Sequence, residues 1–326
     1  MKKTALLLAA SLMTVSMLGA VNTAAADKYT LKLGVVITED DPLFKGLEQM
    51  KAEAEEKSEG RLEIELFPSS QLGDTGELVE QAVSGANVGT IAGAPFLQSY
   101  CEDFGILMGP YLMNSYEDCM KVTSSDLYQS WVDEIAKSNV QVLCFNYQQG
   151  PRYMVTKQPV VHPEDMKGMM IRTFSQSLPF GAVEKTGAVG STLSWGEVYT
   201  GLQQKVIDGA EAQISAISGS SLEEVAPYIA KTGHFQMLSG LVIGSLWYDT
   251  LPDDLKEILT TAAINGGVYA SDLVYEKEAE YEKTLTEKGA VITEVDVDEW
   301  KAAMDPIYDE LNLRDLKNAI DEIIAG

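Results

Sequence analysis

Hydrophobic and polar positions along this chain switch between the period of a strand and the period of a helix. Leu31 to Val35 alternate as in a strand, and Asp41-Pro42 supplies a helix N-cap followed by proline at the first helical position. Apolar residues at helical spacing follow as far as residue 54, and a second alternating run covers residues 62–66. The pattern predicts a strand, helix, strand unit.

The same alternation continues down the chain. Two capping boxes, Asp74 with Glu77 and Ser194 with Glu197, predict two further helices, the second running to Asp208-Gly209. Such alternation predicts an α/β fold of mixed sheets flanked by helices, with ligands bound beyond the carboxyl ends of the strands. Strands are expected at residues 88–91, 140–145, 154–156 and 169–172.

One long helix is expected late in the chain. Residues from Pro252 to about Lys288 favour a helix throughout, apart from the pair Gly266-Gly267. The roughly 300 residues that follow residue 26 exceed the size of one hydrophobic core, so two domains are expected. A helix of this length crosses both domains, and the glycine pair marks a bend or a close contact with a neighbour.

The first 26 residues have the organisation of an export signal. Lys2 and Lys3 precede an apolar run over residues 5–20, and the small residues up to Ala26 form a cleavage site. The run is interrupted by polar residues, which makes an uncleaved membrane anchor the weaker interpretation. We expect a mature protein that is periplasmic and does not insert into the membrane.

The chain is strongly acidic. Its formal charge of −25 becomes −27 once Lys2 and Lys3 are removed with the signal peptide. This charge argues against nucleic acid and anionic membranes as partners. An anionic ligand would need discrete cationic groups that reverse the field locally.

Catalytic and metal-binding patterns are scarce. The chain has two histidines, His162 and His234, and neither has a recognisable partner in the sequence. No nucleophile elbow, zinc-protease helix, Walker loop or calcium loop is present. We therefore expect no catalytic residues, no metal site and no cofactor. Cys101, Cys119 and Cys144 are too few for a disulfide framework, so one pair oxidises or all three are small buried residues.

Arginine is the informative basic residue. Only four of the 24 basic residues are arginine, and the planar guanidinium binds a carboxylate through two parallel hydrogen bonds. Arg172 ends a predicted strand and Arg152 heads another, so the two either face one cleft or form structural salt bridges.

Three other residues are candidate ligand contacts. Trp195 follows a helix N-cap, where it either stacks on a ligand or packs against the preceding strand. Gln213 either donates to a ligand oxygen or satisfies a neighbouring backbone group. Glu77 has a complete explanation in its capping box and is the nearest ligand candidate from the first part of the chain.

Several motifs together resemble the solute receptors of tripartite ATP-independent periplasmic (TRAP) transporters, the DctP-like dicarboxylate-receptor family. The resemblance covers nearly all of the chain after residue 26. It lies in motifs in the family's order and spacing: Phe67-Pro68, Pro163-Glu164-Asp165-Met166-Lys167-Gly168 before Ile171-Arg172, Gly196-Glu197-Val198-Tyr199, Asp208-Gly209-Ala210-Glu211, and Trp247-Tyr248.

This resemblance implies a two-domain periplasmic-binding-protein fold of type II, with a ligand cleft between the domains and the long helix bracing both. Domain I would comprise residues 27–149 and about 238–277, and domain II residues 150–237 and about 278–326. By the resemblance, Arg172 clamps the ligand carboxylate and Arg152 is the second cation. Gln213 takes a place near which many relatives carry asparagine, and Lys205 stands where relatives usually have glycine.

The implied function is capture of a small organic acid, either a four-carbon dicarboxylate or a sugar acid such as a uronate. The receptor, expected to be a monomer, would deliver this acid to the small and large TRAP membrane subunits. The alternative is a secreted enzyme acting on acidic sugars, which requires a positioned acid and base that the sequence does not identify.

Overall fold

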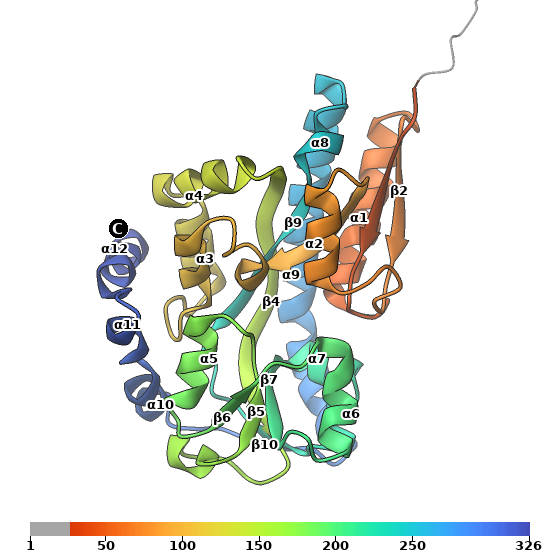
Figure 1. Cartoon of the computed structure of the whole chain (residues 1–326). Coiled ribbons are helices and arrows are strands. Elements are labelled where there is room, and N and C mark those ends of the chain that lie inside the picture. The colour runs from red at the N-terminus through yellow and green to blue at the C-terminus, as the bar shows by residue number, and fades with distance from the viewer. Residues whose placement is uncertain (1–26) are drawn as a thin grey trace, which may run out of the picture.

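The computed structural model describes residues 27–326, so the predicted signal peptide lies outside the described residues. The chain forms mixed sheets flanked by helices, which confirms the predicted fold class (Figure 1). The strands are β1 (Tyr29–Gly34), β2 (Leu62–Phe67), β3 (Val88–Gly93), β4 (Val140–Thr156), β5 (Met170–Arg172), β6 (Val189–Ser191), β7 (Gly209–Gln213), β8 (Tyr228–Ala230), β9 (Gln236–Gly244) and β10 (Val291–Thr293). The helices are α1 (Pro42–Lys57), α2 (Thr75–Val83), α3 (Tyr116–Thr123), α4 (Asp126–Ala136), α5 (Ser177–Glu184), α6 (Val198–Gln203), α7 (Ile214–Gly219), α8 (Ser245–Tyr248), α9 (Asp253–Glu287), α10 (Val297–Met304), α11 (Ile307–Glu310) and α12 (Arg314–Ala325).

The strands form two sections joined by β4. Strand order is β2-β1-β3-β9-β4-β7-β5-β6, with β8 and β10 beside the end of β4. Residues 140–151 of β4 pair with β9, and residues 152–156 pair with β7. We call β1, β2, β3, β9 and the earlier part of β4, with α1 and α2 that pack on them, the first section. The second section comprises β5 to β8, β10 and the later part of β4, with α5 and α7.

The predicted strand, helix, strand unit is present at the start of the first section. Asp41 caps α1 by accepting a hydrogen bond from the Leu43 amide at 2.9 Å, and Pro42 begins the helix. The predicted capping box of α2 is also present, since Asp74 accepts from the Glu77 amide and Glu77 from the Asp74 amide. These local signals are sufficient to predict where each helix begins, because each cap satisfies amides that the helix itself leaves unpaired.

Two predicted element boundaries are wrong. The expected strands at 140–145 and 154–156 are one strand, β4, with register shifts along its pairing with β9. Of the polar residues between them, Tyr147 and Gln148 are fully buried, so the side-chain pattern does not alternate and hides a continuous strand. The expected helix from Ser194 to Asp208 ends at Gln203, because Lys205 adopts a left-handed conformation with φ 62° that terminates it.

The predicted long helix is α9, with 35 residues and no interruption. Gly266 lies against α1, where a Cβ would come within 2.6 Å of the Gly46 carbonyl oxygen. The glycine pair therefore marks a close contact and not a bend. Helix α9 packs on α1 in the first section and on α7 and β10 in the second, so it braces both (Figure 1).

The last three helices run along one edge of the molecule (Figure 1). Helix α11 packs on α5, and α12 packs on α3. The expected domain boundaries place α12 in domain II and α3 in domain I, so this contact joins the two. The domain boundaries themselves stay a prediction. Cys101, Cys119 and Cys144 are free thiols, of which Cys101 and Cys119 are buried.

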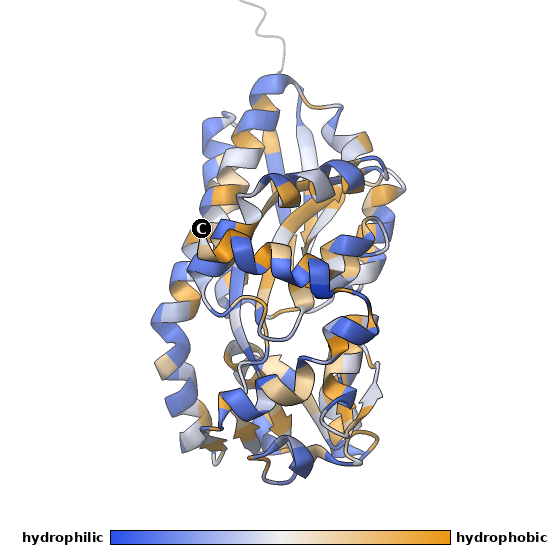
Figure 2. Cartoon of the chain, turned by 90° about the vertical axis from the view of Figure 1, so that its left-hand side faces the viewer, coloured by the Kyte–Doolittle hydropathy of each residue, from blue (hydrophilic) through white to orange (hydrophobic). Residues whose placement is uncertain are grey.

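Hydrophobic residues gather between the sheet and the helices, whereas the outward helix faces are largely hydrophilic (Figure 2). Apolar burial is the dominant favourable term in folding, so this layered core holds the two sections in shape. No helix in residues 27–326 combines the length and the apolar composition that crossing a bilayer requires.

Candidate functional site

A cavity of about 310 Å³ lies between the two sections. It sits where β1, β3, β5 and β7 end, because residues at or just after the ends of these strands line it: Val35 to Ile37, Gly93 and Phe96, Arg172 to Gln176, and Gln213 and Ala216. This is the strand edge at which ligands bind in α/β folds. The lining residues between Val35 and Phe96, with Gln149, Met237 and Ser239, form its first wall. Arg152 with residues 172–176 and 192–195, Gln213 and Ala216 forms its second wall.

Arg152 lies in the second wall, and each of its three guanidinium nitrogens already donates to a protein group. Its side chain is buried, and it donates to the carboxylate and the backbone carbonyl of Glu211. Its remaining Nη1 donates to Gln213 Oε1 at 2.8 Å. Arg152 is therefore an ion-paired cation held in place before any ligand arrives.

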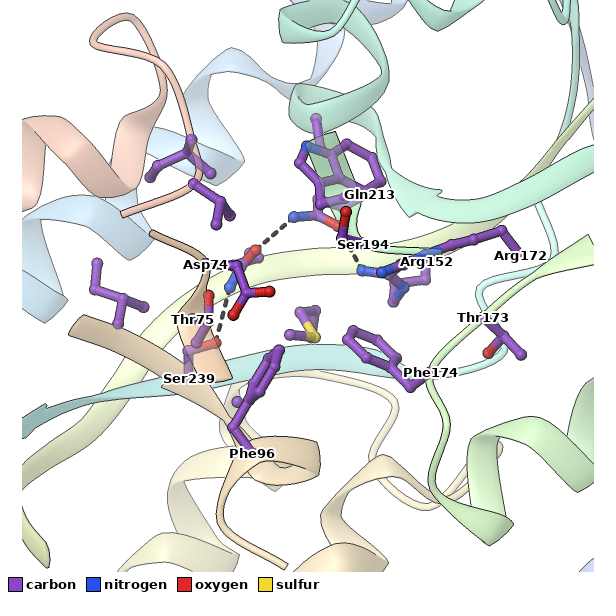
Figure 3. A pocket seen from close by; sticks show the side chains of 18 of the residues that line it. Asp74, Thr75, Phe96, Arg152, Arg172, Thr173, Phe174, Ser194, Gln213 and Ser239 are labelled. Atoms are coloured by element: carbon purple, nitrogen blue, oxygen red, sulfur yellow. Dashed lines mark hydrogen bonds between the residues drawn. The ribbon is translucent and has the colours of Figure 1, made fainter. Parts of the chain in front are cut away.

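Arg172 is held differently. It is 6% exposed, and its Nε donates to the Leu193 carbonyl at 2.9 Å. Its guanidinium lies 5.2 Å from the centre of the Phe174 ring and 5.7 Å from that of Trp195. Within residues 27–326 its two terminal nitrogens donate to no protein group, so they present a free fork to the cavity (Figure 3).

The charges around the two arginines leave one positive charge unpaired. Glu211 is fully buried, bonds Arg152, and accepts from the Thr173 hydroxyl at 3.2 Å. Burial lowers the pKa of Arg172 to about 10, with Glu211 opposing and Arg152 reinforcing this shift. Arg172 thus stays protonated at neutral pH, and the second wall offers a single free cation in an acidic protein.

A row of polar side chains extends from the arginines across the cavity. Gln213 donates to Gln149, and Gln149 donates to the Ser239 hydroxyl at 2.8 Å (Figure 3). Arg152 and Gln213 are cross-strand neighbours on β4 and β7, which aligns the row. Each amide keeps one further donor and one acceptor lone pair for a ligand.

Four of the five predicted site residues line the cavity, namely Arg152, Arg172, Trp195 and Gln213. Glu77 does not line it, because its carboxylate points back to the Asp74 amide in the capping box. The residue of α2 that reaches the cavity is instead its N-cap, Asp74, followed by Thr75 (Figure 3).

Two contacts cross the cavity. Phe96 of the first wall meets Phe174 of the second edge to face, with ring centres 6.2 Å apart. Gln176 donates to the Pro95 carbonyl at 2.7 Å. Sequence reasoning missed Phe96 and Phe174. Both lie within three residues of a strand's carboxyl end, which was the one signal that could have identified them.

The two histidines lie outside any catalytic arrangement. Exposed His162 contacts Glu299 at 2.8 Å. His234 is completely buried, and burial lowers its pKa to about 3, so it stays neutral. No group of three or more His, Cys, Asp or Glu in residues 27–326 is placed to hold a metal ion.

Comparison with known proteins agrees with this geometry. The model of the DctP family, bacterial extracellular solute-binding protein family 7, matches residues 33–315. Solute-binding protein RD1_1052 of Roseobacter denitrificans is 29% identical over 281 residues, 86% of each chain. Its structure with bound L-galactonate superposes with a TM-score of 0.86, covering 92% of this chain and 99% of that one, at 26% identity.

Two other solved TRAP solute-binding proteins have a similar fold, each at 30% identity. The Ochrobacterium anthropi protein with bound L-fuconate gives a TM-score of 0.88, covering 91% of this chain and 99% of that one. The ligand-free open protein of Escherichia fergusonii gives 0.80, covering 90% and 99%. The chain therefore belongs to the DctP family of bacterial extracellular solute-binding proteins, the solute receptors of TRAP transporters.

Proposed function

We propose that this protein captures a small organic acid by its carboxylate and delivers it to the membrane subunits of a TRAP transporter. The observation that carries the proposal is Arg172, a buried guanidinium with a free fork facing the cavity. A carboxylate would pair with both terminal nitrogens, and such charge-assisted bonds contribute about 1.5–3 kcal/mol net of solvation.

The charge count favours a ligand with one carboxylate in the cavity. Glu211 neutralises Arg152, so only Arg172 remains unpaired among the lining cations. Of the two ligand classes suggested by the sequence, a four-carbon dicarboxylate would bury a second carboxylate without a free cation. A sugar acid such as a uronate brings one carboxylate, and the relatives with bound L-fuconate and L-galactonate support that class.

Ligand binding would be signalled to the membrane subunits by closure of the cleft. The two cross-cavity contacts, Phe96 with Phe174 and Gln176 with Pro95, form only when the walls approach each other. The TM-score is higher with the ligand-bound protein of Ochrobacterium anthropi, 0.88, than with the open protein of Escherichia fergusonii, 0.80. This difference supports a closed arrangement. We propose that the membrane subunits recognise this closed shape, and that the receptor acts as a periplasmic monomer.

Thermal unfolding with a panel of dicarboxylates, uronates, aldonates and keto acids tests the proposal. An acid at a hundredfold excess over its Kd stabilises the folded protein by about 2.7 kcal/mol. Arg172→Ala should abolish this stabilisation, and Arg172→Lys should reduce it because lysine lacks the planar fork.

Arg61→Ala is the matched control, since Arg61 does not line the cavity and pairs with Asp254 at the surface. It should leave ligand stabilisation intact. The carboxylate clamp is wrong if no acid in the panel stabilises the protein, or if Arg172→Ala responds as the wild type does.

A further inference from the structure

The polar row that begins at Arg152 has a fixed hydrogen-bond direction. Arg152 has only donors, so Gln213 must present its carbonyl oxygen to it, at 2.8 Å. The amide nitrogen of Gln213 then donates to the carbonyl oxygen of Gln149, and the nitrogen of Gln149 donates to the Ser239 hydroxyl oxygen at 2.8 Å (Figure 3). Turning either amide around would place two donors against each other. Every bond of the row therefore donates from Arg152 toward Ser239.

Ser239 ends this row with a hydrogen that no described protein group accepts. Its oxygen accepts from Gln149, so its hydroxyl hydrogen has to donate elsewhere. Ser239 is fully buried and lines the cavity, and within residues 27–326 its only side-chain hydrogen bond is the one from Gln149. A buried donor without an acceptor is costly, so an oxygen of a bound acid at this point would be stabilised.

Glycine at position 93 leaves space beside the Ser239 hydroxyl. Gly93 and Ser239 are cross-strand neighbours on β3 and β9, and both line the cavity. A Cβ at position 93 would lie 3.5 Å from the Ser239 hydroxyl oxygen and 2.8 Å from the methyl carbon of Met237. Because glycine has no side chain, this space belongs to the cavity and is open to an oxygen of a bound acid.

Ser239 stands in a first wall that is mainly hydrocarbon. The other polar side chains of this wall are Asp74, Thr75 and Gln149. Its remaining side chains, Gly93 apart, are apolar: Val35, Val36, Ile37, Leu43, Ile91, Phe96 and Met237. Of the polar groups, Ser239 is the one whose donor is directed by a buried cation in the opposite wall.

We infer that Ser239 is a specificity-determining residue, which donates a hydrogen bond to an oxygen on the body of the bound acid while Arg172 holds its carboxylate. This inference deepens the proposed function and rests on it. Ser239 and Arg172 lie in opposite walls, so together they select the spacing between the carboxylate and that oxygen. An acid without a hydroxyl or carbonyl oxygen at this spacing leaves the buried donor unpaired and binds more weakly.

The row strengthens this hydrogen bond. Its first donor is a cation, and hydrogen bonds arranged head to tail polarise one another, which makes the Ser239 hydroxyl a better donor. Gln149 is a positioning residue, because it turns the hydroxyl hydrogen away from itself. Arg152 thus contributes to ligand binding although its own nitrogens are all bonded to protein groups.

Isothermal titration calorimetry on the mature protein, freed of co-purified ligand by unfolding and refolding, tests the inference. The probes are L-galactonate, L-fuconate, galacturonate and succinate. Ser239→Ala should raise the Kd of the tightest-binding probe about three- to tenfold, the loss of one neutral hydrogen bond. The matched control is Thr90→Val, which removes a buried hydroxyl of β3 that does not line the cavity. It should leave the Kd unchanged.

A reversed row separates hydrogen bonding by Ser239 from a structural effect. In Gln149→Glu the carboxylate only accepts, so it takes the Ser239 hydrogen and turns it away from the cavity. Adding Ser239→Ala to this variant should leave its Kd unchanged. An equal rise in both backgrounds would show that the direction of the row has no role.

The outcomes distinguish this inference from the carboxylate clamp. If Arg172→Ala loses binding while Ser239→Ala binds as the wild type does, the role of Ser239 is overturned and the clamp stands. An equal loss in Ser239→Ala and Thr90→Val also overturns it, because the loss would then be a general effect on the fold. If none of the four probes binds the wild type, the inference and the proposed function are both overturned.

Discussion

The two walls of the cavity solve different physical problems. The second wall contains two buried arginines, and one of them, Arg152, is paired with buried Glu211 and bonded to Gln213 before a ligand arrives. The first wall buries mainly hydrocarbon, which needs no partner. The comparison teaches that the charged wall is built for rigidity, because a buried ion without partners is costly, whereas the apolar wall mainly supplies shape.

The largest expected effect comes from the ion pair of the second wall. Glu211→Gln keeps the size of the side chain but leaves the buried Arg152 without its counter-charge. Breaking a buried pair by removing one partner costs about 3–5 kcal/mol, and urea unfolding at pH 7 measures this loss. Asp254→Asn, which breaks the surface pair with Arg61, should change stability little. A Glu211→Gln protein as stable as the wild type would mean that Glu211 is protonated in the fold.

The protein should also lose stability in acid through His234, which lies beside Glu211. Burial, reinforced by Arg152, lowers the pKa of His234 to about 3, and Glu211 lies 3.9 Å from its Nε2. The unfolded chain takes up a proton near pH 6.5, while the folded chain does not until about pH 3. The stability contribution is therefore complete above pH 6.5 and falls by up to about 1.4 kcal/mol for each pH unit below it.

His234→Gln removes this titration. We compare the two proteins by urea unfolding at pH 7, 6 and 5. As the pH falls, the wild type should lose stability relative to the variant. A difference that stays constant with pH would show that the folded chain protonates His234 as readily as the unfolded chain does.

These second-wall contacts mark where sequence reasoning stops. The caps at Asp41 and Asp74 were predictable because a helix N-terminus is decided by residues within one turn. Arg172 was predictable as the end of a strand. The pairing of Arg152 with Gln213 depends on the antiparallel register of β4 and β7, which no local pattern encodes. Strand β9 is buried along its whole length, so it lacks the alternation that identified the other strands.

The first section should show the opposite response to pH. Burial raises the pKa of Asp41 to about 6, although its hydrogen bond from Leu43 acts against the rise. The folded chain thus holds a proton between about pH 4 and 6 that the unfolded chain releases. The contribution of Asp41 is complete below pH 4 and is lost as the pH rises through 6, by about 3 kcal/mol in total.

Asp41→Asn keeps the capping oxygen and removes the titration. Relative to this variant, the wild type should lose stability between pH 4 and pH 6.5, as measured by urea unfolding. The pH slopes due to Asp41 and to His234 should therefore have opposite signs. Parallel slopes would contradict the contrast between them.

The smallest effect expected is at the point where the walls meet. Phe96 and Phe174 stack edge to face, a geometry that contributes about 0.5–1.5 kcal/mol beyond burial. Phe96→Leu, Phe174→Leu and the double variant form a cycle in which ligand affinity is measured by calorimetry. Because Phe174 also lies beside Arg152 and Arg172, its replacement should weaken binding more than that of Phe96.

A coupling of 0.5 kcal/mol or more would show that the rings stabilise the closed form together. Additive losses would mean that each wall binds the ligand independently, and closure would then depend on Gln176 and the ligand itself.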